Sequence, residues 1–225
     1  MKRGAAVPRR WLVAMLDRTF GGVPCDVRDE VMGVALEHAL AGGRTRVART
    51  FAAEPVARRS RPDGGFASLE LTLPWLTASL AGVNEGGLAV ASVSLAPPAH
   101  DADCAVPAAM FAQDCLARFD SREGAIDWCL GRPAGGRAAI LLADASGVAA
   151  VEIDGGARRV VQPKDGLLLE GIGDGDAAGA LRGGASLDAL RLEQILGARV
   201  ACLDPGGRRI GFRWADSDFV AWLDV

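Results

Sequence analysis

The five cysteines of this 225-residue chain are its candidate nucleophiles. A cysteine attacks a carbonyl carbon as its thiolate, and a helix N-terminus or a nearby cation lowers the thiol pKa enough to supply that form. Cys25 fits this role best, because it precedes Asp26 at the start of a segment with helical spacing. The alternative is an ordinary thiol in a loop that caps a helix, and the sequence around Cys25 favours this alternative.

Metal and cofactor chemistry has little support in the sequence. Candidate zinc ligands lie in one stretch without a recognised ligand spacing: His100, Asp101, Asp103 and Cys104. Asp174 and Asp176 could contact calcium, but the loop around them lacks the twelve-residue EF-hand pattern. No G-x-G-x-x-G motif follows a strand, and residues 144–147 do not form the G-x-S-x-G turn of serine hydrolases. We therefore predict no metal and no cofactor.

Composition limits the class of protein. Half of the residues are hydrophobic and the net charge is −3, so the chain can bury the core of one large domain or two small ones. No dense basic block indicates nucleic-acid binding, and no apolar run is long enough to span a membrane. The cysteines are scattered without a CxxC pair, which favours reduced thiols in a cytoplasm. A homo-oligomer is compatible with this composition but not specified by it.

The most specific local pattern is a polar turn that runs into a long apolar strand. Asn84, Glu85 and two glycines form strong turn chemistry, since Asn tolerates and Gly readily adopts left-handed backbone conformations. Residues 88–95 then alternate large apolar and small side chains and are rich in valine, as in a strand buried on both faces. We expect a hairpin turn entering a central strand, with Val90 and Val93 buried.

The remaining pattern predicts an N-terminal helical segment followed by strands, a helical pair and more strands. Residues 11–20 and 26–40 have helical spacing, which predicts a helical leader over residues 1–44 and a second domain over residues 45–225. Further strands are expected at 46–51, 66–73, 138–143, 148–153, 159–162, 167–170, 199–203, 210–214 and 219–223, and helices at 107–119, 122–130 and 187–196. Residues 54–65 and 171–184 are expected to be connections without regular structure. This order is typical of an α+β fold.

The turn and strand also carry a family resemblance. Residues 82–90, Gly-Val-Asn-Glu-Gly-Gly-Leu-Ala-Val, resemble the Gly-Met/Val-Asn-Glu-x-Gly-Leu segment of cysteine-type N-terminal nucleophile (Ntn) hydrolases. These include the choloylglycine hydrolases and the isopenicillin N acyltransferase (peptidase C45-like) family. A helix with Asp120-Ser121 near its start, followed by Leu-Ala-Asp-Ala-Ser-Gly at 142–147, is similar to the acyltransferase branch. The resemblance implies an Ntn-hydrolase-like αββα sandwich, complete or truncated, related to enzymes that act on C–N amide bonds.

The resemblance also implies which residues should carry catalysis, and several are absent. Relatives expose a cysteine at the start of the mature chain, on a strand that hairpins into a second strand ending in Arg-Asn-x-Asp. Residues 47–52 match that second strand, with Arg49 in the place of the arginine, but no cysteine lies at the hairpin distance upstream. Residues 30–35 instead resemble the helical leader of the acyltransferase branch, which leaves no nucleophile strand. Ala139 stands where relatives have an asparagine, and Glu170 lies where they commonly read Thr-Asn-His.

Two hypotheses about function follow. The first is a binding or scaffold homologue that keeps the pocket, for an acyl or amide small molecule, and lacks the catalytic cysteine. The second is an active cysteine amidohydrolase or acyltransferase, processed at an N-terminal cysteine, that uses Cys25 or an unrecognised residue. Arg49 and Asn84 keep the family pattern, so we expect them to face one cavity. A buried Arg49 would need an acidic partner, Glu54 or Glu85, contact with solvent, or an anionic ligand.

Overall fold

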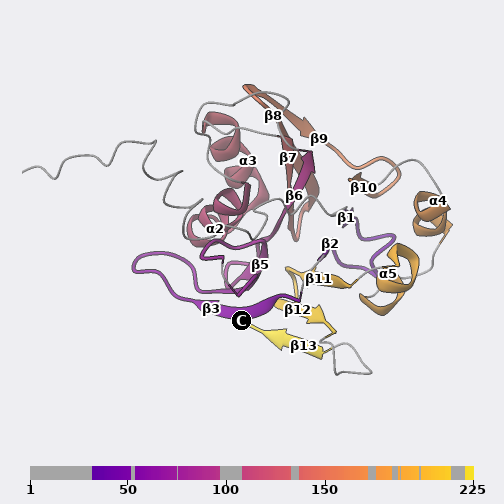
Figure 1. Cartoon of the computed structure of the whole chain (residues 1–225), viewed down its shortest axis with the longest axis horizontal. Helices are drawn as coiled ribbons and strands as arrows, with labels where there is room; N and C mark the ends of the chain where they lie inside the picture. The colour runs from indigo at the N-terminus through magenta and orange to yellow at the C-terminus, as the bar shows by residue number, and fades with distance from the viewer. Residues whose placement is uncertain are drawn as a thin grey trace, which may run out of the picture.

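The computed structural model consists of two antiparallel sheets packed face to face, with helices on both outer sides (Figure 1). It describes residues 32–51, 54–74, 76–96, 108–132, 137–171, 176–183, 187, 189–197, 199–213 and 221–225. Among these residues, no helix is long and apolar enough to cross a membrane.

The first sheet has six strands. Their order across the sheet is β10 (Leu167–Glu170), β1 (Gly33–Leu36), β2 (Arg46–Thr50), β11 (Val200–Asp204), β12 (Arg209–Phe212) and β13 (Ala221–Asp224). Side chains alternate between its two faces, so that Ala35 and Val47 point toward the second sheet while Val34 and Ala48 point outward. Both faces of this sheet are covered by other parts of the protein, which explains why apolar residues follow one another along its strands.

The second sheet has seven strands in chain order. They are β3 (Val56–Ser60), β4 (Ser68–Thr72), β5 (Ala81–Asn84), β6 (Ala89–Ala96), β7 (Arg137–Asp144), β8 (Gly147–Asp154) and β9 (Ala157–Val161). Strand β6 lies in the middle, and Val90 and Val93 are fully buried on its two faces. The predicted hairpin turn and central strand are therefore confirmed.

In the described part of the chain, two helices cover each sheet and complete an αββα sandwich. Helices α2 (Ala108–Arg118) and α3 (Arg122–Gly131) pack on the second sheet through residues such as Phe111, Leu116 and Ala125. Helices α4 (Asp176–Gly183) and α5 (Ala189–Leu196) pack on the first sheet through Leu181 and Leu192. The fold class expected from the sequence is confirmed.

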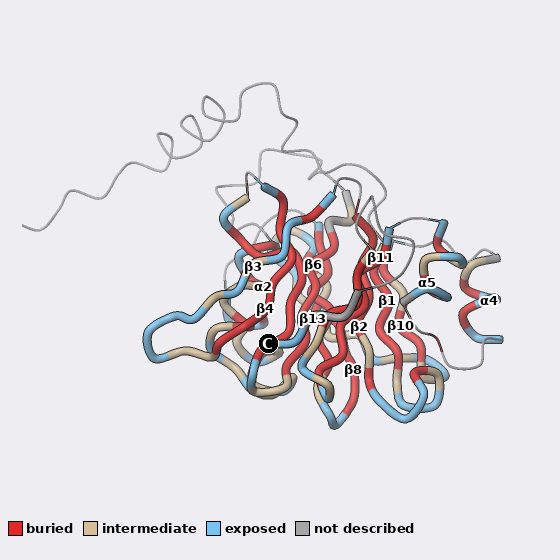
Figure 2. The backbone as a smooth tube through the Cα atoms, turned by 90° about the horizontal axis from the view of Figure 1, so that it is seen from below, coloured by how far each residue is buried: buried red, intermediate tan, exposed pale blue. Residues whose placement is uncertain are grey.

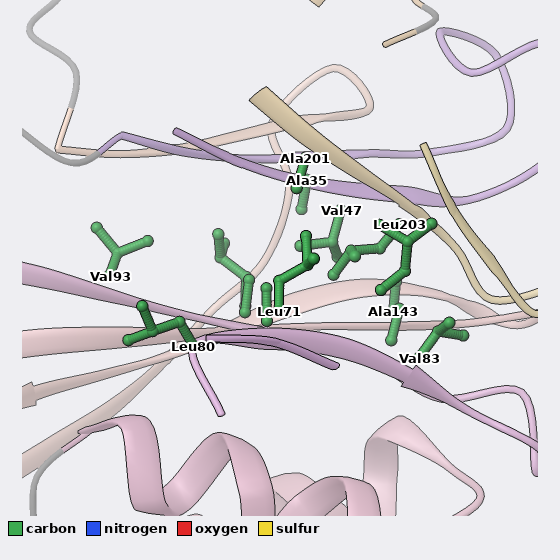
Figure 3. Close-up of a cluster of buried hydrophobic side chains, with 14 of the residues drawn as sticks. Ala35, Val47, Leu71, Leu80, Val83, Val93, Ala143, Ala201 and Leu203 are labelled. Atoms are coloured by element: carbon green, nitrogen blue, oxygen red, sulfur yellow. The ribbon is translucent and has the colours of Figure 1, made fainter. Parts of the chain in front are cut away.

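The largest apolar cluster lies between the two sheets. In Figure 3, Ala35, Val47 and Leu203 from the first sheet approach Val83, Val93 and other residues from the second. Figure 2 shows that most strands are buried along most of their length, while exposed residues concentrate in the connecting loops and in the edge strands β3 and β9. This core fixes the separation of the sheets and so the positions of side chains in between.

Three predictions about local structure are wrong. The helix expected at 26–40 is replaced by strand β1 over Gly33–Leu36, because a run that is apolar on both strand faces also satisfies helical spacing. The connection expected at 54–65 contains strand β3, an edge strand in which arginines interrupt the apolar pattern that would predict a strand. The loop expected at 171–184 contains helix α4. Residues 1–31 lie outside the described residues, so the leader stays a prediction there.

Candidate functional site

One row of residues crosses the first sheet at the level where strand β1 begins and strand β10 ends. Glu170 pairs with Gly33, Gly33 pairs with Arg49, and Arg49 pairs with Ala201. Directly paired residues of antiparallel strands project from the same face. This face is the inner one, because Arg49 reaches Ser92 on the second sheet. The fold thus brings together three segments, around residues 33, 49 and 170, that lie far apart in the sequence.

A matching row on the second sheet faces this one. It runs from Val93 to Ala139, Glu152 and Arg159 in register. The Glu152 carboxylate accepts a bond of 2.6 Å from Arg159, whose side chain is 72 % exposed at the sheet edge. We call the four ionisable residues of the two rows the charged row: Arg49, Glu170, Glu152 and Arg159.

Gly33 occupies the strand position opposite Arg49, and it has no room for a side chain. A Cβ atom at Gly33 would lie 2.5 Å from Val93 Cγ2 and would also overlap Leu141 Cδ1. Both of those side chains are fully buried in the core between the sheets. The space in front of this backbone is therefore already filled by hydrocarbon.

Arg49 is a buried cation held by neutral groups. Its side chain is 3 % exposed, its Nε donates to the Ser92 carbonyl at 2.6 Å and its Nη1 donates to the Thr50 carbonyl at 3.3 Å. The guanidinium also lies 4.5 Å from the centre of the Phe51 ring. Burial lowers the pKa of Arg49 to about 9, so that it is still charged at neutral pH. Within the described part of the chain, Arg49 forms no ion pair.

The carboxyl group of Glu170 lies across Gly33 from Arg49. Burial raises its pKa to about 7, and the negative charge of Glu152 adds to this, while Arg159 opposes it. Glu170 is therefore partly protonated at neutral pH and can donate as well as accept a hydrogen bond. The charged row thus contains a buried cation, Arg49, and a carboxyl group, Glu170, that titrates near neutrality.

Asn84 is placed in a different layer. Its amide donates to the carbonyls of Leu116 and Phe119 at 2.8 and 2.7 Å, and its Oδ1 accepts from the Leu88 N–H at 2.9 Å. The side chain is fully buried and joins the β5–β6 turn to the end of helix α2. Arg49 points between the sheets, so the structure does not bring the two residues into one cavity. The prediction that Arg49 and Asn84 share a pocket is wrong, because the Asn84 side chain is hydrogen-bonded to the end of helix α2 instead.

The expected acidic partners of Arg49 are engaged elsewhere. Glu54 pairs with Arg199 at 3.2 Å, and Glu85 accepts from the Ala67 N–H at 2.9 Å. Cys25 lies outside the described residues, as do His100, Asp101, Asp103, Cys104 and Asp174. In the described part of the chain, no group of three or more His, Cys, Asp or Glu could hold a metal ion.

Sequence reasoning did not identify Gly33 as a site position. The available signal was its spacing before Arg49 in an apolar run, but that run had been assigned to a helix. Glu170 was noted as a departure from the family pattern, and Ala139 as another. The structure places both in the rows around Gly33.

The chain matches no family model, and no curated protein sequence matches it. Solved structures do match. An N-acylethanolamine-hydrolyzing acid amidase ortholog of Caenorhabditis elegans is 14 % identical with a TM-score of 0.65, over 85 % of this chain and 99 % of that one. Penicillin V acylase of Agrobacterium tumefaciens is 14 % identical with a TM-score of 0.57, over 87 % and 86 %.

The conjugated bile acid hydrolase of Clostridium perfringens matches in two variant forms. The first is 13 % identical with a TM-score of 0.60, over 87 % of this chain and 92 % of that one. That form has a cysteine replaced by alanine, and the second form has an arginine replaced by leucine 16 residues further along. Together these likenesses show that the chain has the Ntn-hydrolase fold of this group of enzymes.

Proposed function

We propose that this protein is a non-hydrolytic, ligand-binding or scaffold member of the Ntn-hydrolase fold group. The observation that carries the proposal is Gly33, which stands opposite Arg49 with no space for a side chain. A cysteine and an arginine are 16 residues apart in the two variants of the bile acid hydrolase, and Gly33 precedes Arg49 by the same 16 residues. A nucleophile at this strand position would be a side chain that this chain lacks.

The other described cysteines do not replace it. Cys115 and Cys129 lie among the helices outside the second sheet, and Cys202 lies on the outer face of the first sheet. All three are buried. Because none of them faces the layer between the sheets, none can serve a substrate held at the charged row.

A small molecule with a carboxylate and an acyl or amide group is the ligand class that we propose. Arg49 keeps a buried positive charge that is bonded only to neutral carbonyls in the described part of the chain, and such a cation gains most from an anion. Two of the structural neighbours are named as an amidase and an acylase, which supports an acylated compound as the remainder of the ligand.

The ligand can be tested by thermal denaturation. We expect acetate, phenylacetate or octanoate to raise the melting temperature relative to chloride at equal ionic strength. A carboxylate at 100 times its Kd stabilises by about 2.7 kcal/mol, which corresponds to roughly 5–10 °C for a chain of this size. The shift should disappear in Arg49→Met and persist in Arg159→Met, the exposed cation of the same row. Equal shifts in both variants, or none in the native protein, would refute the carboxylate site.

The absence of hydrolysis is tested separately. The purified protein should keep its full-length mass, with no cleavage before Cys25, and should release no product from penicillin V or a conjugated bile acid. A mature chain that begins at Cys25 together with turnover would establish the alternative, an active cysteine amidohydrolase or acyltransferase.

A further inference from the structure

Two buried thiols on different helices lie next to each other in the layer outside the second sheet. The Sγ atoms of Cys115 on α2 and Cys129 on α3 are 3.6 Å apart. Both residues are fully buried among apolar neighbours that include Phe111, Leu116 and Ala125. The two sulfurs are therefore in direct contact within an apolar cluster.

We propose that Cys115 and Cys129 form a reversible disulfide that joins α2 to α3. This proposal is independent of the ligand site at Arg49. A disulfide has its sulfurs about 2.05 Å apart, so the pair must close by roughly 1.5 Å, or about 0.8 Å for each side chain. Cys202, in the other layer of the molecule, has no such arrangement with the pair.

The oxidant in this reaction is a low-molecular-weight disulfide such as oxidised glutathione. One protein thiol loses its proton and attacks a sulfur of the small disulfide, whose S–S bond breaks and releases one small thiol. The second protein thiolate then attacks the protein sulfur of the mixed disulfide, forms the Cys115–Cys129 bond and releases the second small thiol. The protein loses two protons and two electrons, and the small disulfide gains them.

The native packing should make this reaction slow. The hydrogen bond between the two sulfurs and burial both raise the pKa of the Cys115 thiol, so that little thiolate is present. The first attack also needs a sulfur that the oxidant can reach, which requires the helical layer to open locally. Once the mixed disulfide forms, the neighbouring thiol is already in place. We therefore expect oxidation to accelerate in urea well below the unfolding midpoint.

The disulfide would stabilise the part of the fold that Asn84 holds. The two carbonyls that accept from Asn84 belong to Leu116, which directly follows Cys115 on α2, and to Phe119, just beyond the end of α2. The bond would close a short loop between residues 14 apart. A loop of this length predicts a rise in melting temperature of about 6–12 °C over the reduced protein.

The test is to treat the full chain with oxidised glutathione, with and without low urea, and then to measure intact mass and map cysteine peptides. We expect a linked Cys115–Cys129 peptide, with no glutathione retained on either of these two cysteines, in the native protein and in the matched control Cys202→Ala. Cys115→Ala and Cys129→Ala should instead keep a glutathione adduct on the remaining thiol. Reduction should reverse the rise in melting temperature. Separate adducts on both cysteines, or two free thiols after hydrogen exchange has shown that α2 opens, would overturn the proposal.

Discussion

Replacing Gly33 by alanine tests whether the strand position opposite Arg49 is closed. The new Cβ would lie 2.5 Å from Val93 Cγ2 and would overlap Leu141 Cδ1, and both partners are fully buried. Adding one methyl group to a filled core costs about 1–3 kcal/mol, because neighbouring side chains must leave their preferred rotamers. For this chain length the loss corresponds to roughly 2–12 °C in melting temperature.

The assay is urea denaturation of four proteins that form a double-mutant cycle. Leu141→Ala alone should cost about 2–5 kcal/mol, since it opens a cavity in the core. The same change made in Gly33→Ala should cost about 1–2 kcal/mol less, because it also removes the overlap. Gly179→Ala is the matched control, since its Cβ would meet no atom within 4 Å and alanine favours the helix.

One result would refute this reasoning. If Gly33→Ala is as stable as the native protein and its effect adds to that of Leu141→Ala, the position has room for a side chain. The proposal that a nucleophile is excluded there would then lose its physical basis.

Two further predictions concern Asn84 and Glu170. Asn84→Ala should destabilise the protein by about 3–5 kcal/mol in urea denaturation, because two buried backbone groups and one part-buried carbonyl lose their partner. Asp114→Ala on the exposed face of α2 should change stability by less than about 0.5 kcal/mol, and equal effects of the two changes would contradict the role of Asn84. Folding raises the pKa of Glu170 from 4.5 to about 7, so the stability of the folded protein should fall as the pH rises from 4.5 to 7 and Glu170 ionises. Glu170→Gln should show a smaller fall over that range, and parallel melting profiles of the native protein and the variant would contradict the pKa shift.

The sequence by itself determined the central part of the fold. Gly87 specifies a tight turn after Asn84, since its φ of 89° lies in the left-handed region that few other residues adopt. The apolar strand that follows can only be stable with both faces covered, and the structure confirms this for Val90 and Val93. These features depend on local conformation and burial, which residue type largely decides.

Only the tertiary structure decided what lies around Arg49. Residues 33–36 are apolar at every position after the glycine, and such a run fits a helix or a strand until its partners are known. Pairing between β1, β2 and β10 selected the strand and set Gly33 between Arg49 and Glu170. The pairing also directed Arg49 between the sheets, while Asn84 turned toward α2. Which face a side chain takes follows from strand register, and the pairing of β1 with β10 and of β2 with β11 joins segments more than 100 residues apart.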